Sequence, residues 1–468
     1  MATKQIVEDA AVEGLRFNFR GDLIRPGDPG YDDARSRHNA MFDKRPALIA
    51  RCTGTADVQA ALGFALQNGL SIAIRGGGHS VAGFSSLDDG VVIDLSGMRG
   101  VHVDPSGKTV RAQGGALWGD VDRETAVHGL ATPGGVVSTT GIAGLTLGGG
   151  FGLLSMKYGL SCDNLLSADM VTADGRVVTA NAEQNEDLYW GLRGGGGNFG
   201  IVTSFQYRLY DVPQVLISMT MYSPEQGADM LAFVRSQYDE AHPDLAFVGV
   251  FLTVPEDPPM PIFPPEILGK KMCAILKIWP GDPEEGEKAL APFKAFGKPS
   301  FDITLPMPYT MAQTIQDEDT PWGSRNYWKT AYLKDLTPEV IDIVASKAPQ
   351  APSPMTSALV GRFGGAIAAV GDMETAFPLR DAGYLIQMDA CWTDAKDDEE
   401  NLAFSREISG AVQPHALDRA YVNFFGDEGA EKVETAYGAE RYKKLVAIKD
   451  KYDPTNVFNL NHNIKPSR

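Results

Sequence analysis

The chain has 468 residues, 43% of them hydrophobic and 22% charged, and its formal net charge is -18. This length predicts two or three domains or one large two-lobed unit, and the composition is that of an ordinary globular protein. An acidic surface repels phosphate backbones, so the charge argues against nucleic acid as a partner.

No stretch of the sequence approaches the roughly 18 consecutive apolar residues of a membrane span. Residues 1–17 carry scattered charges and lack the apolar core of a signal peptide. The four cysteines, Cys52, Cys162, Cys273 and Cys391, are far apart and form no CxxC pair. This spacing argues against a metal site or a redox dithiol and is typical of a reducing compartment. We therefore predict a cytoplasmic protein that binds neither a membrane nor a metal ion.

The first 212 residues combine short strands and helices without the regular order of a βαβ protein. Residues 55–69 predict an amphipathic helix with Thr55 as its N-cap and Gly69 just after its end. Two further helices are predicted over residues 116–131 and 185–195. Strands or hairpins are predicted over residues 70–75, 90–96, 101–105, 109–115, 165–181 and 200–212.

Glycine is concentrated in the same region, because a large share of the 51 glycines lies between Gly69 and Gly200. Glycine loses the most backbone entropy on folding, so such a density needs a structural reason. Usual reasons are tight turns with positive φ and close approach of the backbone to a ligand. The clusters span residues 75–83, 112–119, 132–152 and 191–200. Their number predicts a large ligand that lies along the main chain.

The first cluster, RGGGHS at residues 75–80, follows a predicted strand and can turn several N–H groups toward an anion such as a diphosphate. It lacks the GK[ST] ending of a P-loop. The GxGxxG spacing at residues 195–200 precedes a strand, where a dinucleotide-binding fingerprint requires a helix. His79 lies in the first cluster, and a neutral imidazole is a competent nucleophile once its other nitrogen is held. A capping or hydrogen-bonding histidine is the alternative.

After residue 212 glycine becomes less frequent, and strand patterns alternate with helices up to about Pro414. A helical stretch over residues 438–458 follows near the end of the chain. The sequence resembles the berberine-bridge-enzyme-like FAD-linked oxidases of the vanillyl-alcohol-oxidase superfamily in four ordered segments, at residues 75–98, 132–175, 187–203 and 437–464.

This resemblance implies an α+β fold with two lobes. Residues 1–212 and the C-terminal return, residues 415–468, would form a PCMH-type FAD-binding domain. Residues 213–414 would form an inserted substrate domain, built from an antiparallel sheet with helices.

The resemblance also implies that FAD is the cofactor and that His79 bonds the 8α carbon of the flavin. The diphosphate would lie along residues 75–83 and the flavin ring near residues 132–145. The predicted FAD contacts are Arg75, Gly76, Gly77, Gly78, His79, Ser80, Val81, Gly83, Pro133, Gly134, Gly135, Ser138, Thr139, Gly141, Ile142, Gly144, Leu145, Gly148, Gly149, Gly152, Ile201, Val202, Asn461 and Asn463.

Many members of the family carry a second covalent bond, from a cysteine to flavin C6. Gly141 stands at the matching position, so the resemblance implies a single link, through His79. Cys162 lies 21 residues later and is expected to be a small buried side chain.

The sequence departs from the family at the expected catalytic base. Two tyrosines of relatives are matched by Phe424 in AYVNF and by Phe363 in RFGGA, and a phenyl ring cannot accept a proton. Tyr421 is expected on the opposite face of the AYVNF strand, so it does not replace Phe424.

A different carboxylate lies on the predicted strand over residues 383–392. Strand alternation places Gln387 and Asp389 on one face, together with Leu385 and Cys391. Leu385 stands where relatives often have a catalytic glutamate, whereas the glutamine of relatives is present as Gln387. Burial would raise the pKa of Asp389 and make it a usable base. A solvent-facing or backbone-bonded Asp389 is the alternative.

Residues 319–336 resemble the stretch that reaches over the flavin in relatives. Its candidate substrate contacts are Trp322, Tyr327, Trp328, Lys329 and Tyr332. Tyr327 and Lys329 are preferred because each has a polar tip, and a core role for the aromatic residues is the alternative. The predicted catalytic residues are thus Asp389, Gln387 and Tyr327.

The predicted reaction takes a hydride from a carbon of a small organic substrate to covalently bound flavin, which O2 or another acceptor reoxidises, with H2O2 as the product from O2. The two phenylalanines favour an apolar substrate, an aromatic or polycyclic alcohol of the natural-product type. A carbohydrate or alcohol oxidase is the first alternative, and a flavin-holding protein with little catalysis is the second.

Overall fold

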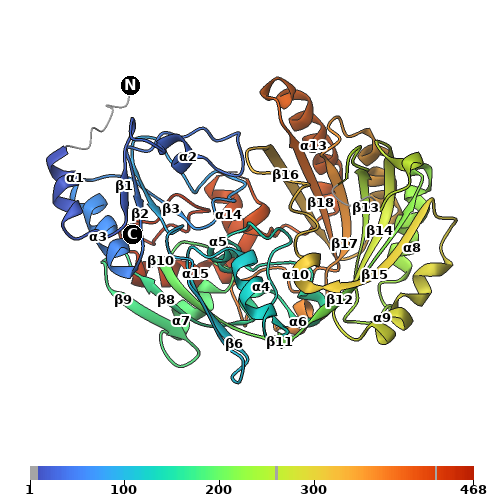
Figure 1. The fold of residues 1–468 in the computed structure, drawn as a ribbon, viewed down its shortest axis with the longest axis horizontal. Helices are drawn as coiled ribbons and strands as arrows, with labels where there is room; N and C mark the ends of the chain where they lie inside the picture. The colour runs from blue at the N-terminus through green and yellow to red at the C-terminus, as the bar shows by residue number, and fades with distance from the viewer. Residues whose placement is uncertain (1–8, 259–261, 427–428) are drawn as a thin grey trace.

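The computed structural model describes residues 9–258, 262–426 and 429–468. The chain forms two lobes that lie side by side, as Figure 1 shows. The first lobe holds the N-terminal half of the chain together with the C-terminal helices, and the second lobe holds the middle of the chain. Both lobes contain helices and sheets, so the predicted α+β class is confirmed. The domain boundaries after residues 212 and 414 stay predictions.

The first lobe contains a sheet of four short strands in the order β1-β2-β4-β3, in which β4 runs parallel to β2 and β3. Its elements are α1 (Asp9–Arg16), β1 (Asp22–Ile24), α2 (Tyr31–Arg35), β2 (Leu48–Arg51), α3 (Thr55–Gln67), β3 (Ile72–Arg75) and β4 (Val91–Asp94). β4 is buried along its whole length, as expected of a central strand that is covered on both faces. Because β3 ends at Arg75, the glycine loop of residues 76–80 begins at the carboxyl edge of this sheet.

Helix α3 tests the predicted helix boundaries. It begins at Thr55 with Gly54 at the N-cap, so Thr55 is the first helical residue and not the cap. No side chain accepts a hydrogen bond at the N-cap, whereas at the other end the side-chain amide of the C-cap residue Asn68 donates to the Phe64 carbonyl at 2.8 Å. Gly69 follows the C-cap residue with a φ of 63°, as predicted for a glycine that ends a helix.

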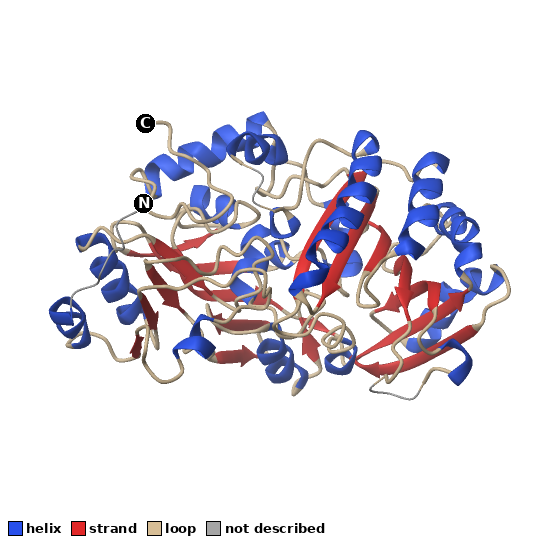
Figure 2. Cartoon of the chain, turned by 90° about the horizontal axis from the view of Figure 1, so that it is seen from above, coloured by secondary structure: helices blue, strands red, loops and turns tan. Residues whose placement is uncertain are grey.

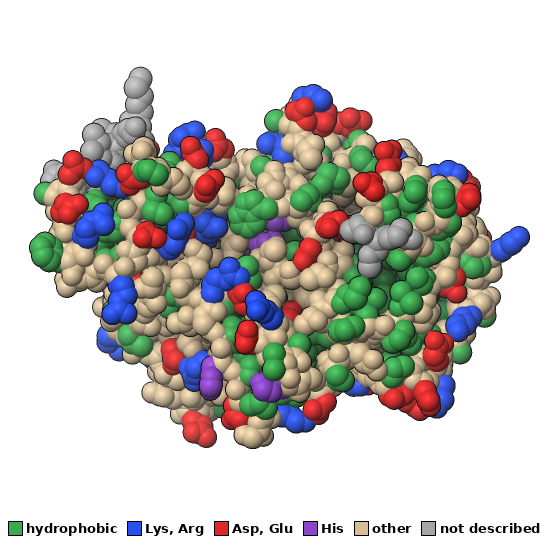
Figure 3. Space-filling model, viewed as in Figure 1, with side chains coloured by type: hydrophobic (Ala, Val, Ile, Leu, Met, Phe, Trp, Pro, Cys, Tyr) green, Lys and Arg blue, Asp and Glu red, His purple; other side chains and the backbone are tan. Residues whose placement is uncertain are grey.

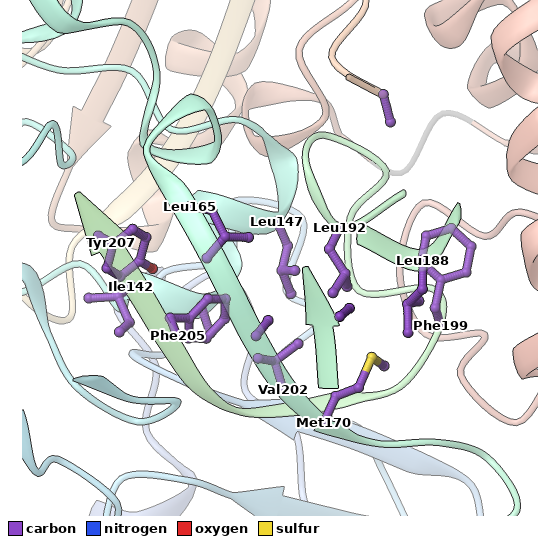
Figure 4. Packing of buried hydrophobic residues seen from close by; sticks show 14 of the residues in the cluster. Ile142, Leu147, Leu165, Met170, Leu188, Leu192, Phe199, Val202, Phe205 and Tyr207 are labelled. Carbon is purple, nitrogen blue, oxygen red and sulfur yellow. The ribbon is translucent and has the colours of Figure 1, made fainter. Parts of the chain in front are cut away.

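The second sheet of the first lobe is antiparallel, in the order β5-β6-β10-β8-β9. Its strands are β5 (Val101–Asp104), β6 (Thr109–Gln113), β8 (Leu165–Val171), β9 (Val177–Asn181) and β10 (Ile201–Arg208). The helices of this part of the lobe are α4 (Trp118–Ala126), α5 (Ile142–Gly148), α7 (Glu186–Leu192), α14 (Ala430–Tyr437) and α15 (Ala439–Tyr452). A separate pair of short strands consists of β7 (Leu130–Ala131) and β11 (Tyr210–Asp211). Figure 4 shows how Leu147 and Leu192 lie over Met170 and Val202 in its core. Leu445 and other C-terminal residues belong to the same core, which therefore joins the C-terminal segment to residues 110–209.

The second lobe is built on an antiparallel sheet of seven strands, in the order β15-β12-β14-β13-β17-β18-β16. The strands are β12 (Gln214–Tyr222), β13 (Ala246–Thr253), β14 (Lys271–Trp279), β15 (Phe301–Pro308), β16 (Arg325–Leu333), β17 (Ser357–Arg362) and β18 (Tyr384–Trp392). The helices that cover one face of this sheet, seen in Figure 2, are α8 (Gly227–Ser236), α11 (Pro338–Lys347) and α13 (Asp398–Val412). Shorter helices are α6 (Ser155–Tyr158), α9 (Pro283–Leu290), α10 (Tyr309–Ala312) and α12 (Ala366–Ala369).

The alternation of side chains along β18 determines which of its residues lie on the face of the sheet that the helices do not cover. On β18, Ile386 and Met388 belong to the core under the helices. The residues between and after them, Gln387 and Asp389, therefore lie on the face that is turned away from the helices. This confirms the predicted alternation over residues 383–392.

A buried ion pair fixes the C-terminal segment to the first lobe. Lys449 of α15 is fully buried, and its ammonium group donates to the Asp453 carboxylate at 2.7 Å, to the Asn198 carbonyl at 2.8 Å and to the Phe458 carbonyl at 2.9 Å. Burial lowers the pKa of Lys449, and Asp453 opposes that shift. Asp453 also accepts from the N–H groups of Val457 and Phe458. All three protons of the ammonium group thus have acceptors in the segments that they join.

Replacing Lys449→Met is expected to lower the free energy of unfolding by about 3–5 kcal/mol, because Asp453 is then buried without its cation. Thermal unfolding followed by circular dichroism measures the loss as a lower midpoint. The matched control is Lys451→Met on the same helix, where the ion pair with Asp187 is exposed and contributes ~1 kcal/mol or less. Similar midpoints for the two variants would contradict this account.

Candidate functional site

A cavity lies where the two lobes meet. Its walls are the glycine loops of the first lobe, the uncovered face of β17 and β18 in the second lobe, and the C-terminal segment around residues 458–462. The space-filling view in Figure 3 shows a hollow near the centre of the molecule with histidine side chains in it. The cavity therefore brings together segments from all three parts of the sequence.

Two glycine clusters meet at the cavity. A Cβ atom at Gly77 would lie 2.3 Å from the backbone nitrogen of Gly141, and a Cβ atom at Gly141 would lie 2.2 Å from that of Gly77. No side chain fits at such distances, so only glycine lets the two loops approach each other. Within the described residues, the N–H groups of Gly77, Gly78, His79 and Ser80 have no protein acceptor. A run of free N–H groups of this kind is a cradle for an anion.

His79 projects from this loop between groups of both lobes. Its Nε2 atom lies 3.0 Å from the hydroxyl of Thr139, and its ring stacks on that of His38 with 4.1 Å between ring centroids. The edge of Trp322, from the second lobe, packs against both imidazoles. Burial, assisted by the nearby His38, lowers the pKa of His79 to about 3, although Thr139 opposes the shift. His79 is therefore a neutral imidazole at physiological pH, with one nitrogen held by Thr139.

His38 was not among the predicted site residues. Its Nε2 atom lies 2.8 Å from the carbonyl oxygen of Thr320, and burial lowers its pKa. His38 lies in the loop after α2. In the sequence, the only sign of its importance was that the chain has just seven histidines. The chain must fold before this loop and residues 319–322 reach the same imidazole.

The structure separates the predicted FAD contacts into two groups. Those that line the cavity are Gly76, Gly77, Gly78, His79, Ser80, Val81, Gly141, Gly144, Leu145, Ile201, Val202 and Asn461. Those that do not line it are Arg75, Gly83, Pro133, Gly134, Gly135, Ser138, Thr139, Ile142, Gly148, Gly149, Gly152 and Asn463. Lining residues that the prediction missed include Val137, Ala143, Phe151, Gly196, Gly197, Asn198, Phe458, Leu460 and His462.

Several residues of the second group make contacts within the protein and do not line the cavity, and their role as FAD contacts stays a prediction. The N–H and hydroxyl of Ser138 donate to the Asp317 carboxylate at 2.7 and 2.6 Å, so Ser138 fastens this loop to the second lobe. Ile142 is fully buried in the core of the first lobe. Gly134 and Gly148 lie against the side chains of Trp118 and Asn423, where a Cβ atom would clash. A glycine-rich sequence does not distinguish these two uses of glycine.

Asp389 and Gln387 both line the cavity, as the predicted alternation requires. The amide nitrogen of Gln387 donates to both carboxylate oxygens of Asp389, at 2.7 and 2.8 Å. Burial raises the pKa of Asp389 to about 7; the Gln387 hydrogen bonds oppose this shift, and the negative charge of Asp319 adds to it. Asp389 thus has the acidity of a general base that works near neutral pH.

Two further groups at this wall were not predicted as catalytic residues. Asp319 opens into the cavity, and burial together with Glu318 raises its pKa to about 6. Trp328 pairs in register with Asp389 across β16 and β18, and its indole Nε1–H is buried without an acceptor in the described part of the chain. Each adds a polar group that a bound molecule can reach.

The prediction for Tyr327 is corrected by its place on β16. Its hydroxyl lies 3.4 Å from Arg406 of α13, and Lys329 lies over its ring, so both project toward the helix-covered face. Neither residue lines the cavity. Alternation along β16 gives the opposite face to Trp328, which replaces Tyr327 as a candidate substrate contact. Trp322 contacts the His79 ring, and Tyr332 is buried in a small core cluster.

The two phenylalanines that replace the tyrosines of relatives lie in different surroundings. Phe424 lines the cavity and packs edge-on against Trp328, whereas Phe363 is 2% exposed and belongs to a core cluster. The segment around Phe424 is a single turn of 3-10 helix (Val422–Phe424) and not the predicted strand. Tyr421 still does not line the cavity, because its hydroxyl oxygen accepts hydrogen bonds from the Gly150 N–H and the Asn423 amide.

The four cysteines are all buried, and none of them belongs to the described residues that line the cavity. Cys162, which was expected to be a small buried side chain, is fully buried beside Asp163, and burial raises its thiol pKa.

Two family models match the sequence. Residues 46–181 match the "FAD binding domain" model, which covers the glycine loop with His79, and residues 420–465 match the "Berberine and berberine like" model, which covers the C-terminal wall of the cavity. The cavity therefore lies between two segments that are both typical of FAD-linked oxidoreductases.

Relatives and solved structures agree with these models over nearly the whole chain. The FAD-linked oxidoreductase YgaK of Bacillus subtilis is 31% identical over 97% of this chain and 98% of its own, and (R)-6-hydroxynicotine oxidase of Paenarthrobacter nicotinovorans is 28% identical over 96% and 98%. The structure of BBE-like 1 from Physcomitrella patens superposes with a TM-score of 0.86 at 25% identity, covering 98% of this chain and 99% of that one. This confirms the predicted fold, and the enzyme class and FAD as cofactor follow from the relatives. The chain belongs to the berberine-bridge-enzyme-like family of FAD-linked oxidases.

Proposed function

We propose that this oxidoreductase holds FAD covalently through His79 alone and oxidises a small, largely apolar organic substrate by removing a hydride from carbon. We further propose that O2 accepts the electrons and leaves as H2O2. One observation carries the proposal: a single cavity joins the glycine loop of the neutral His79 to the Asp389–Gln387 pair on the opposing sheet.

The residues at the cavity fit FAD. The free N–H groups at residues 77–80 suit a diphosphate, and the Asn461 side-chain oxygen is buried at the cavity without a partner among the described residues. Residues 76–81, Gly141 and Asn461 would hold the cofactor, which when bound supplies the two-electron acceptor of the reaction. No cysteine of the described lining offers a thiol for a second bond, which supports a single link.

His79 is suited to covalent attachment. A neutral imidazole is nucleophilic, and the low pKa of His79 keeps it neutral over the physiological range. Thr139 engages Nε2 and orients the ring, so the other nitrogen is left as the group that can bond to the cofactor.

Asp389 is proposed as the base that receives the substrate proton. Its carboxylate is oriented by Gln387, and its pKa of about 7 suits a group that accepts and then releases protons near neutrality. Trp328, Phe424, Phe151 and Leu359 supply apolar walls of the same cavity, which supports an aromatic or polycyclic substrate over a sugar. The unpartnered indole N–H of Trp328 is a donor for a polar atom of the substrate.

Partners and location also belong to the proposal. The acidic charge supports a protein that binds neither nucleic acid nor a membrane surface, and the four free, separated cysteines support a reducing compartment such as the cytoplasm. Among the described helices, none combines the length and the apolar character needed to cross a bilayer.

The test begins with the purified protein, which is denatured in acid, digested and mapped by mass. FAD on the His79 peptide alone is expected, and the intact protein should form peroxide with aromatic alcohols or amines but not with simple sugars. Flavin released into the supernatant would overturn the covalent link. Peroxide formation with sugars alone would favour a carbohydrate oxidase, and a flavin that no carbon substrate reduces would point to a flavin-holding protein.

A further inference from the structure

One connecting segment of the second lobe, here named the strap (residues 313–324), reaches across to the first lobe. It joins α10 to β16. At its start the Gln313 amide donates to the Gly135 carbonyl, and near its end the Gly323 N–H donates to the His38 carbonyl at 3.0 Å. The strap is therefore fastened to two loops of the first lobe that are far apart in the sequence.

In the middle of the strap, Asp317 holds Ser138 with both of its carboxylate oxygens. One oxygen accepts from the Ser138 N–H at 2.7 Å, and the other accepts from the Ser138 hydroxyl at 2.6 Å. Hydrogen bonds to a charged acceptor are stronger than those to a neutral one. The Ser138 carbonyl in turn accepts from the Gly119 N–H at 2.8 Å. All polar groups of Ser138 thus have partners, and the two lobes fix its position together.

Thr139, the next residue along the chain, has little to hold it in place. It is exposed, and within the described residues its N–H has no protein acceptor. Its hydroxyl nevertheless lies 3.0 Å from Nε2 of His79. The position of that hydroxyl therefore follows the backbone of its neighbours, and Ser138 is the neighbour that the second lobe holds.

Two further contacts of the strap confine the same imidazole. The Thr320 carbonyl lies 2.8 Å from Nε2 of His38, whose ring stacks on that of His79. The edge of Trp322 packs against both imidazoles. Asp317, Thr320 and Trp322 thus act on His79 from different sides, and all three belong to one segment of the second lobe.

We propose that Asp317 is a positioning residue for cofactor attachment, which acts through Ser138 and Thr139 on His79. The strap thereby makes formation of the covalent link depend on the docking of the two lobes. This inference rests on the proposed function and concerns how its covalent link is controlled. Its physical basis is that a misplacement of about 1 Å can lower the rate of a reaction about 100-fold.

The attachment step shows why the orientation of the imidazole matters. In the tautomer whose Nε2–H donates to the Thr139 hydroxyl, the other ring nitrogen of His79 carries a free lone pair. That nitrogen forms a bond to the flavin 8α carbon, and one C–H bond of the 8α methyl group breaks. The methyl group and Nε2 each release one proton, and the electron pair of the broken bond passes to the flavin. O2 accepts the two electrons and two protons and leaves as H2O2.

The rate of covalent attachment tests the inference without relying on substrate turnover. Full-length protein from riboflavin-limited cells is incubated with FAD in air, and the flavin that precipitates with the polypeptide in acid is followed over time. We expect Asp317→Ala to attach flavin about 10- to 100-fold more slowly than the unmodified protein. Asp317→Asn should restore most of the rate, because its amide oxygen accepts from the Ser138 N–H and its amide nitrogen donates to the Ser138 hydroxyl.

Glu318→Gln is the matched control, since Glu318 is the next residue of the strap and is exposed. It should attach flavin at the rate of the unmodified protein. Quenching of FAD fluorescence, recorded before attachment, should show that all the variants bind FAD equally well.

Three results would overturn the inference. They are attachment by Asp317→Ala at the rate of the unmodified protein, slow attachment by Asp317→Asn, and weak FAD binding by Asp317→Ala, which would mark Asp317 as a residue of the general fold. A different result would contradict the proposed function itself: an unmodified protein that binds FAD but never attaches it.

Discussion

His79→Ala is expected to abolish covalent flavin, so that acid denaturation releases all yellow colour from the polypeptide. The reason is that no other side chain offers a nucleophile in the place of His79: no cysteine lines the cavity in the described residues, His38 is held by the Thr320 carbonyl, and the His462 ring packs against Phe84 and Phe425. Mass analysis of the intact protein measures the result as the loss of one FAD adduct. Non-covalent FAD should still bind, because the loop N–H groups and Asn461 remain.

His102→Ala is the control for this experiment, since His102 is an exposed residue of β5 in the same lobe and does not line the cavity. It should retain the adduct in full. An adduct that persists in His79→Ala would place the bond on another residue, and the peptide map would identify it.

Asp389→Asn is expected to lower the rate of substrate oxidation by about 10²–10⁴-fold, the usual contribution of a general base. The amide has nearly the shape of the carboxylate but cannot accept the substrate proton. In the unmodified protein the base works only when deprotonated, so the rate should rise with pH through about 7 and level off above it. The variant should lose this rise. Stopped-flow reduction of the flavin at a series of pH values measures both effects.

Asp302→Asn provides the comparison, because Asp302 is an exposed carboxylate on β15, at the far edge of the same sheet. Its rate and pH profile should match those of the unmodified protein. A variant Asp389→Asn that keeps the rise near pH 7 would assign the titration to another group of the cavity, of which Asp319 is the nearest in acidity.

Local patterns in the sequence predicted the structure correctly where a residue's position depends on a single strand, loop or helix end. The alternation over residues 383–392 placed Gln387 and Asp389 on one face without any knowledge of the neighbouring strands, because the side-chain period of a strand is two. The glycine loop after β3 was located because consecutive glycines are rare without a ligand or a tight contact. The glycine just beyond the end of α3, Gly69, was predicted from a local pattern in the same way.

Contacts between distant segments were not visible in the sequence. Whether Tyr327 or Trp328 faces the cavity depends on which side of β16 receives α13, and polarity favoured the wrong residue of the two. Ser138 has the composition of a cofactor contact, yet its hydroxyl binds Asp317, which is 179 residues away. His38 meets His79 because two loops of the first lobe, far apart in the sequence, are joined where the His38 N–H donates to the Gly78 carbonyl. The strand expected around Phe424 became a helical turn, since its residues pack in place between the lobes.

The Lys449–Asp453 pair and the segment that it holds also bear on the order of events during biosynthesis. Every strand of the seven-stranded sheet lies before residue 393, so that sheet can form while the C-terminal helices are still being made. The cofactor cavity cannot be closed at that stage, because Phe458, Leu460 and Asn461 form part of its wall. Flavin attachment is then a late event, and a ribosome-bound chain that ends before α15 would display a folded substrate lobe beside an open, unloaded loop.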